Sequence, residues 1–383
     1  MAAEWDEDSW VILDLHNPAD SDNDDAGILT LSSSCTTAPA CSDDDDEEEI
    51  DFDGEDIEEE EPRAPPPIPL SGLFFHHTES KLKVPSYLAF DAIRSAKQLI
   101  PDPGFSAFPE KVAVLASTHG LVCVRGDTSQ AYYVSNPLTF TRVRLPPHYC
   151  DHWAFGDPAV VITFEEPNAT SSFVDDINHY HVVVAFHLLG GIFAFESFSS
   201  RTWEWTVDPE ICAVEQVVSA SGVGAIGSAF WRTTMGYILR YDPEKGCTEI
   251  FPAPEEVNAR PVWELGEMEG SLCVTCMDEH VTEVAVLSLN NNLEVRDGES
   301  RWAWAGQFEG GKLRNREGVS LLRSQGASEV VMWDPMEERV VAMDLEGRTT
   351  RTIGIGPLTD DNYDEYFIPY VGSFAQIRAN NRV

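Results

Sequence analysis

Short apolar runs of strand length recur from Ser71 onward, and they constrain the fold more than any other feature. Many are rich in Val, Ile, Tyr, Phe and Trp, which suit a pleated, half-buried surface. Gly, Pro, Asn and Asp separate them, so many short strands joined by turns favour a sandwich, a barrel or a propeller over βαβ units. The clearest runs are Gly72–His76, Val112–Leu115, Leu121–Arg125, Ala131–Ser135, Ala159–Phe164, His181–Leu188, Ile192–Phe195, Ala225–Trp231, Tyr237–Tyr241, Leu272–Met277, Val284–Leu289, Val330–Trp333 and Arg339–Met343.

These runs group into a unit that recurs at a period of roughly 40 to 50 residues, the range in which repeats indicate propeller blades. Two terminal segments, Ser71–Phe90 and Tyr366–Ile377, remain outside the repeats. Pairing them would close the ring as a sixth, composite blade and remove the exposed sheet edges. We therefore predict an all-β fold, a β-propeller of six blades. The repeat units are Gly120–Pro147, Ala159–Val207, Gly227–Pro254, Gly270–Asp297 and Leu321–Arg348.

Turn and helix signals refine this prediction. Asn136-Pro137, Asp242-Pro243 and Asp334-Pro335 are expected in equivalent turns, because Pro presets φ and the Asx side chain bonds turn amides. Only Tyr87–Leu99 has a helical pattern, and the prolines that follow would end it.

The N-terminal segment differs sharply in charge. Residues 1–62 hold 24 Asp and Glu and no Lys or Arg, which leaves 42 acidic and 25 basic residues elsewhere. We expect residues 1–62 to be a disordered acidic tail, since self-repulsion and little apolar surface oppose collapse. Residues 63–69 form a Pro-rich linker, residues 70–378 the propeller and residues 379–383 a C-terminal tail. The tail's interleaved acidic and apolar residues suit either a solubilising role or binding to a basic protein.

Composition also limits the cellular setting. Both parts of the chain are acidic, which disfavours nucleic-acid and anionic-membrane partners. No signal peptide or membrane-spanning run is evident. The eight cysteines show no disulfide-framework spacing, so we expect a cytoplasmic or nuclear protein with reduced thiols.

Several segments in this order resemble the plant F-box-associated, kelch-like β-propeller family. They are SGLFFHHTES (Ser71–Ser80), PSYLAF (Pro85–Phe90), YYVSNPLTFTRVRLPP (Tyr132–Pro147), GSAFWRTTMGYILRYDPEKG (Gly227–Gly246) and PYVGSF (Pro369–Phe374). The resemblance spans about residues 70–378 and implies a substrate-receptor propeller of a ubiquitin ligase. The F-box that family members carry before this region is not recognisable, because the acidic tail stands there.

Aromatic side chains are the main candidates for partner binding. Trp203 and Trp205 alternate along one predicted strand, as do Trp302 and Trp304, so each pair is expected on one face. Most would pack between blades, but some would line a rim where Trp anchors a peptide. Together with Arg232, these four are the predicted partner-binding residues.

Catalytic and metal motifs are weak. Gly222-Val223-Gly224-Ala225-Ile226-Gly227 matches G-x-G-x-x-G, but a strand follows it and not a helix, so we interpret the glycines as allowing close packing. Cys273 and Cys276 form a lone CxxC whose members would point to opposite faces of a strand.

Histidines raise a minority metal hypothesis. His179 and His181 would share a strand face, with His187 or Asp175 as a third ligand. His76, His77 and His119 are interpreted as strand-end polar residues. We expect no metal and no cofactor.

The sequence therefore predicts a non-catalytic module that binds a protein at a propeller mouth. Two alternatives stay open. One is a propeller hydrolase with two carboxylates in the axial channel. The other is a binder of basic nuclear proteins that acts through the acidic tail.

Overall fold

The computed structural model describes residues 70–79, 82–90, 100–165, 179–188, 192–208, 212, 216–278, 283–289, 301–309, 318–345, 350–354 and 363–377. The chain divides into two units, Met1–Arg63 and Ala64–Val383. The predicted acidic tail and linker, and the C-terminal tail at 379–383, lie outside the described residues, as does His77's side chain.

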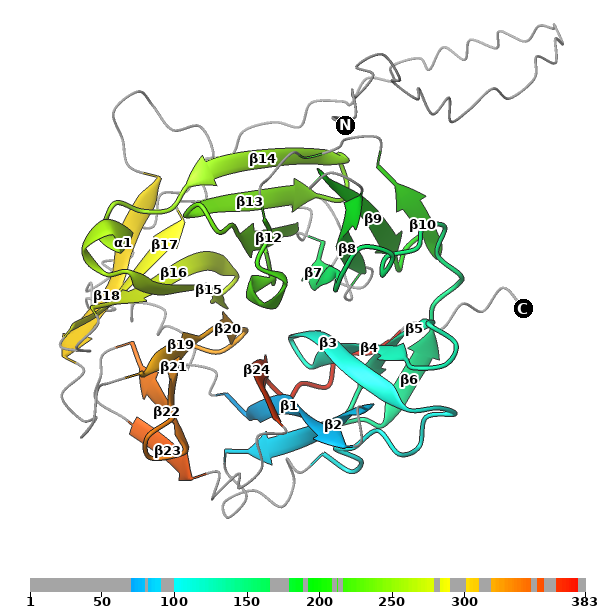
Figure 1. Ribbon diagram of the computed structural model, residues 1–383, viewed down its shortest axis with the longest axis horizontal. Coiled ribbons are helices and arrows are strands. Elements are labelled where there is room, and N and C mark those ends of the chain that lie inside the picture. Colours follow the sequence, from blue (N-terminus) through cyan, green and yellow to red (C-terminus); the bar gives the residue numbers. More distant parts are fainter. Residues whose placement is uncertain are drawn as a thin grey trace, which may run out of the picture. The chain divides into compact units, whose positions relative to one another are not determined.

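Six antiparallel sheets surround a common axis, which confirms the six-bladed β-propeller (Figure 1). Blade 1 consists of β24 (Tyr363–Tyr370), β1 (Gly72–Glu79) and β2 (Leu82–Ala89). Blade 2 consists of β3 (Val112–Thr118), β4 (Leu121–Gly126), β5 (Tyr132–Asn136) and β6 (Thr141–Arg144). Blade 3 consists of β7 (Ala159–Phe164), β8 (Tyr180–Leu188), β9 (Ile192–Ser199) and β10 (Glu204–Val207).

The remaining blades follow in chain order. Blade 4 consists of β11 (Val223–Ala225), β12 (Ser228–Arg232), β13 (Tyr237–Asp242) and β14 (Cys247–Pro252). Blade 5 consists of β15 (Val262–Met268), β16 (Ser271–Met277), β17 (Glu283–Leu289) and β18 (Trp302–Glu309), with β20 (Ser324–Gln325) added parallel to β15. Blade 6 consists of β19 (Ser320–Leu322), β21 (Glu329–Asp334), β22 (Arg339–Asp344) and β23 (Thr350–Gly354). The short helices are η1 (Ser219–Ser221) and α1 (Glu256–Ala259).

The chain ends close the ring as predicted. Strand β24 pairs with β1, with Gly72 opposite Tyr370 and Phe74 opposite Ile368. The two strands lie side by side in Figure 1, red against blue. Because β24 is the inner strand of blade 1, the last described strand completes the sheet that the first two begin.

Apolar cores lie between neighbouring blades. Among the described residues there are six such clusters, one for each junction of the ring. The junction of blades 2 and 3 contains Tyr132, Tyr180 and Phe198, and that of blades 3 and 4 contains Phe195 and Trp231. Burial of such large side chains contributes about 1.5–3 kcal/mol each.

Alternating strand direction gives the propeller two distinct faces. We call one the hairpin face, because the tight turns after the inner strands of blades 2, 4 and 5 lie there. Each turn is a two-residue pair with positive φ at both positions, such as His119 (42°) and Gly120 (87°), which is the type I′ arrangement that matches strand twist. We call the opposite one the loop face, because it carries the connections between blades.

Three sequence expectations need correction. The run Ala225–Trp231 is not one strand, since a turn at Ile226 and Gly227 separates β11 from β12. The helical pattern at Tyr87–Leu99 is wrong at its start, where β2 pairs with β1 through residue 89; residues 91–99 lie outside the described part. Asp334-Pro335 joins the second and third strands of its blade, whereas the other two Asx-Pro turns join the third and fourth.

Candidate functional site on the loop face

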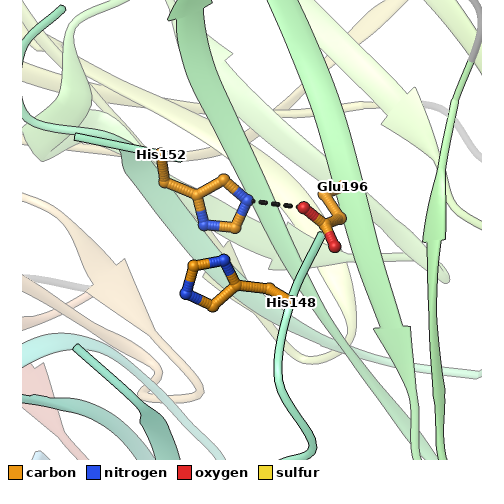
Figure 2. Close-up of side chains that lie close together, drawn as sticks. All are labelled: His148, His152 and Glu196. Atoms are coloured by element: carbon orange, nitrogen blue, oxygen red, sulfur yellow. Dashed lines mark hydrogen bonds and ion pairs between the residues drawn. The ribbon is translucent and has the colours of Figure 1, made fainter. Parts of the chain in front are cut away.

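A buried carboxylate fixes the loop between β6 and β7, residues 145–158. Glu196 on β9 accepts hydrogen bonds from the backbone N–H of Tyr149 at 2.7 Å and of Cys150 at 3.0 Å. His152 Nε2 lies 2.8 Å from Glu196 Oε2, and both side chains are fully buried (Figure 2). The three contacts tie the loop of one blade junction to the third strand of blade 3.

The protonation states of this pair follow from their surroundings. Burial lowers the pKa of His152 and outweighs the opposing effect of Glu196. Burial opposes ionisation of Glu196, but hydrogen bonds from His152 and the two backbone amides outweigh it and lower its pKa. A neutral His152 therefore donates from Nε2 to the carboxylate and accepts at Nδ1 from the Tyr132 hydroxyl, 2.9 Å away.

The third residue of this cluster, His148, does not complete a metal centre. Its ring stacks on that of His152 (Figure 2), and the ring centroids are 4.5 Å apart with planes inclined by 19°. Lone pairs of parallel stacked rings do not converge on one ion, and His148 Nδ1 already bonds the Cys150 carbonyl at 2.6 Å. The cluster therefore acts as an anchor for the loop.

The anchored loop presents two aromatic side chains to solvent. Tyr149 is 74% exposed and Phe155 is 52% exposed. Exposed apolar side chains that gather on one surface indicate an interaction site, whereas single ones are common on any protein. The exposed acidic residue Asp151 lies between the two aromatics in the sequence, and the exposed Asp157 follows Phe155.

Contacts connect this loop to blade 4 along the same face. The Ser219 hydroxyl donates to the Asp157 carbonyl at 3.2 Å, and Val217 bridges to Thr233 beside the β12–β13 turn. That turn exposes Met235 (61%), and β13 begins with Tyr237 (44%). We call Tyr149, Phe155, Met235 and Tyr237 the apolar strip.

The predicted tryptophans of blade 3 have packing roles. Trp205 is 4% exposed, which corrects its prediction as a partner contact, and its indole N–H donates to the Pro146 carbonyl at 2.8 Å. Trp203 packs edge-on against Phe198 in the same core, with centroids 5.3 Å apart. Trp205 thus holds the start of the loop that carries the apolar strip.

The predicted tryptophans of blade 5 lie on its outer strand. Trp302 is half-buried against Phe251, with centroids 6.4 Å apart. Trp304 is 53% exposed and stays a predicted contact residue. Neither lies near the β6–β7 loop, since both belong to the outer edge of another blade.

Arg232 lies at the end of β12, on the loop face, where blades 4 and 5 meet. Its guanidinium lies over the Trp263 ring, 5.0 Å from the centroid, and contacts the Trp263 carbonyl. Its Nη2 is 3.8 Å from Glu264 Oε2. Burial raises the pKa of Glu264, and the charges of Arg232 and Arg323 oppose that rise only in part. The structure therefore does not bring Arg232 together with the predicted tryptophans.

A buried glutamine crosses the axial channel. Gln325 Nε2 donates to Thr118 Oγ1 and to the Gly224 carbonyl, both at 3.0 Å, and lies 3.4 Å from Glu267 Oε2. Gly224 N–H donates back to Gln325 Oε1 at 3.2 Å. One side chain thus joins the inner strands of blades 2, 4 and 5.

His119 lies at the hairpin end of this channel network. Its Nε2 is 3.2 Å from Glu267 Oε2, and its side chain is 42% exposed. Burial opposes protonation, but the hydrogen bond and charge of Glu267 outweigh it and raise the pKa of His119. His76, in contrast, is buried and accepts a hydrogen bond from the Val114 N–H at 3.0 Å.

Two interpretations of sequence motifs are confirmed. A Cβ on Gly222 would lie 2.6 Å from Val161 Cγ2, and one on Gly224 would overlap the Ile162 carbonyl, so β11 packs tightly on β7. Cys273 and Cys276 share β16, and their thiols lie in the cores on opposite sides of blade 5.

Sequence reasoning missed Glu196 and His152. They are 44 positions apart, and neither stands in a recognisable motif. The one available signal was Glu196 itself, which directly follows the apolar run Ile192–Phe195. A charged residue in such a strand indicates a buried carboxylate with a partner.

Comparison with known proteins gives distant structural likenesses, which carry no argument about this chain. No family model and no curated protein matches the chain. A structure described as YCF48 from Cyanidioschyzon merolae aligns with 75% of this chain and 86% of its own, at 12% identity and a TM-score of 0.39. YCF48 bound to D1 peptide aligns at 11% identity and a TM-score of 0.37, over 77% of this chain and 85% of its own.

A complex of KlAtg21 with the coiled-coil of AgAtg16 aligns at 9% identity and a TM-score of 0.34, covering 64% of this chain and 70% of its own. Likenesses at these identities and TM-scores carry no functional argument. No helix among the described residues is long and apolar enough to cross a membrane.

Proposed function

We propose that this propeller is a protein-binding module and that its partner docks on the apolar strip of the loop face. The observation that carries the proposal is the buried Glu196–His152 anchor beneath the exposed Tyr149. A buried ionic group is costly, and a loop fixed in advance loses less entropy on binding. Exposed aromatic side chains on a fixed loop match the anchors that dominate protein interfaces.

Charge indicates the chemistry of the partner. Residues 63–383 hold 42 acidic and 25 basic residues, and Asp151 and Asp157 border the strip. A partner segment with apolar side chains flanked by Lys or Arg would complement this surface.

Affinity purification with matched variants tests the proposal. Full-length protein and the double variant Tyr149→Ser/Phe155→Ser are compared as baits, and the recovered proteins are quantified by mass spectrometry. Phe374→Ser, which alters a residue 79% exposed beyond β24 on the hairpin face, is the matched control. We expect a protein retained by wild type and control but depleted at least about tenfold by the double variant, as for loss of anchors of about 1.4 kcal/mol or more.

Equal recovery by all three baits would refute the assignment of the site. A parallel Trp304→Ser bait tests the predicted contact on blade 5. Loss of the partner from that bait alone would move the binding surface to the outer edge of blade 5.

We further propose that the module is a receptor-type propeller related to the plant F-box-associated family. Its support is the ordered resemblance from Ser71 to Phe374 together with the six-bladed fold. Affinity purification tests this proposal when baits with and without residues 1–62 are probed for cullin-ligase adaptors. The same two baits test the alternative that the acidic tail binds basic nuclear proteins. Partner recovery unchanged by the deletion would refute the tail alternative.

One observation favours the hydrolase alternative, namely the raised pKa of Glu264 near the axis. A raised carboxyl pKa is a usual feature of a general acid. A panel of chromogenic glycosides tests this alternative. Hydrolysis by the wild type that is abolished in Glu264→Gln would establish it. Absence of turnover by the wild type would refute it for those substrates.

A further inference from the structure

Three potential metal ligands meet on the hairpin face where blade 3 adjoins blade 4. Glu165 directly follows β7, His181 lies on β8, and Glu244 lies in the β13–β14 turn. One ligand atom from each lies within 4.8 Å of the others. Donor atoms about 2.0–2.2 Å from a tetrahedral Zn²⁺ ion lie about 3.3–3.6 Å apart, so binding requires the side chains to rotate toward one another.

The buried imidazole of His181 is the independent sign of a ligand. The residue is 6% exposed, and its Nδ1 has no hydrogen-bond partner. Its Nε2 lies 3.4 Å from Glu165 Oε1. A buried polar nitrogen without a partner costs about 1–3 kcal/mol, and coordination to a metal would offset that cost.

Arg201 orients the carboxylate for this role. Its Nε lies 3.1 Å from Glu165 Oε2 and 3.4 Å from Oε1, and its Nη2 also contacts Oε2. Oε1 is the oxygen that faces His181. A hydrogen bond to the second oxygen of a ligating carboxylate is a usual feature of metal sites. Arg201 therefore contacts Oε2 more closely than Oε1, and Oε1 is the oxygen turned toward His181.

The donor set selects the ion. One imidazole nitrogen and two carboxylate oxygens suit Zn²⁺ with a water molecule in the fourth position. Mg²⁺ and Ca²⁺ prefer sites made of oxygen alone. We propose that His181, Glu165 and Glu244 bind a Zn²⁺ ion that links blade 3 to blade 4.

The sequence pointed to part of this site. It singled out His179 and His181, with His187 or Asp175 as a third ligand. The structure places His187 at the opposite end of β8 with its ring 4.0 Å from that of Phe193, and Asp175 lies outside the described residues. The two glutamates come from other segments, 16 and 63 positions from His181.

Zinc titration of the full chain tests the proposal. The protein is treated with EDTA, dialysed with a phosphine reductant, and titrated with ZnCl₂ against a fluorescent zinc indicator at pH 7.5. We expect one strong site in the wild type, weakened at least about tenfold in His181→Gln and in Glu244→Gln. Glu244 is exposed, so that variant leaves folding unaffected, and Glu255→Gln, at another exposed glutamate, is the matched control.

Two further measurements exclude other zinc ligands. His148→Gln should keep full affinity, because its cluster is the loop anchor. Zinc should raise the melting temperature of wild type and Glu255→Gln more than that of Glu244→Gln, and MgCl₂ at the same concentration should have no effect. Absence of a strong site in the wild type, or full affinity in either ligand variant, would overturn the proposal.

Discussion

Replacing Glu196 by glutamine should destabilise the propeller and release the β6–β7 loop. The carboxylate accepts from the Tyr149 amide on one oxygen and from the Cys150 amide and His152 on the other. A glutamine amide keeps one acceptor and places an NH₂ group against a donor. At least one charge-assisted hydrogen bond is lost, at about 1.5–3 kcal/mol, and a buried donor is left unpaired at about 1–3 kcal/mol. The expected cost is therefore about 3–5 kcal/mol, as for a broken buried ionic pair.

Two assays separate the global from the local effect. Urea unfolding gives the loss of free energy, with Glu204→Gln on neighbouring β10 as a control, because an exposed glutamate should change it by less than about 0.5 kcal/mol. Hydrogen exchange should accelerate about 100-fold or more at the Tyr149 and Cys150 amides, since each 1.4 kcal/mol is tenfold. Unfolding within 0.5 kcal/mol of wild type, or unchanged exchange, would refute the anchor.

The same anchor has a pH dependence of defined sign. The pKa of His152 and that of Glu196 are both lowered in the folded protein. Each group therefore contributes stability above its unfolded pKa, about 6.5 for His and 4.3 for Glu, that is lost as pH falls. Wild-type stability should decline from about pH 6.5 downward, and Glu196→Gln should remove the portion lost near and below pH 4.3.

Three further predictions concern the axis and its packing. Gln325→Ala should cost about 2–4 kcal/mol in urea unfolding, because Thr118 and the Gly224 backbone lose buried partners; a cost below 1 kcal/mol would show that water replaces the amide. His119→Gln should remove a stabilisation that is complete below about pH 6.5 and lost as pH rises through the raised pKa of His119, seen as a melting-temperature difference that shrinks between pH 6 and pH 9. Gly224→Ala should destabilise by about 1–3 kcal/mol through overlap with β7, whereas Gly104→Ala, with open space around its Cβ, should be neutral; equal effects would contradict the packing argument.

The parts of the fold that could be predicted are those in which burial leaves a local pattern. Strands such as β7 and β21 are apolar along nearly their whole length, because both sides pack against neighbouring blades. The outer strand β6 was not among the predicted runs, since most of its residues face solvent and the sequence TRVR carries no apolar run. The outer strand β10 was indicated by the alternation of Trp203 and Trp205. Ring closure was predictable for a different reason, namely that strand material at both ends had no partner nearby in sequence.

The parts of the site that could not be predicted depend on contacts across the ring. In the sequence, Gln325 has the pattern of a polar residue in a turn. Its contacts with three inner strands exist only in the closed ring. Asp334-Pro335 was recognised as a turn, but the dipeptide does not encode which two strands it joins. Tyr149 was missed because an exposed tyrosine in a Pro- and His-containing loop has no pattern; its significance comes from Glu196 beneath it.

The two blade junctions on either side of blade 3 show how one sheet can serve two purposes. Toward blade 2, Glu196 is satisfied by backbone amides and a neutral histidine, so its charge needs no ion and its effect is to hold the loop. Toward blade 4, His181 is also buried, its Nδ1 has no hydrogen-bond partner, and two carboxylates lie within reach. A buried hydrogen-bond network in which every group has a partner rigidifies the segments that it joins. A buried nitrogen without a hydrogen-bond partner favours the binding of an added ligand. The same reasoning therefore assigns protein binding to the loop face and metal binding to the hairpin face, and Glu196→Gln and Glu244→Gln should affect these two functions independently.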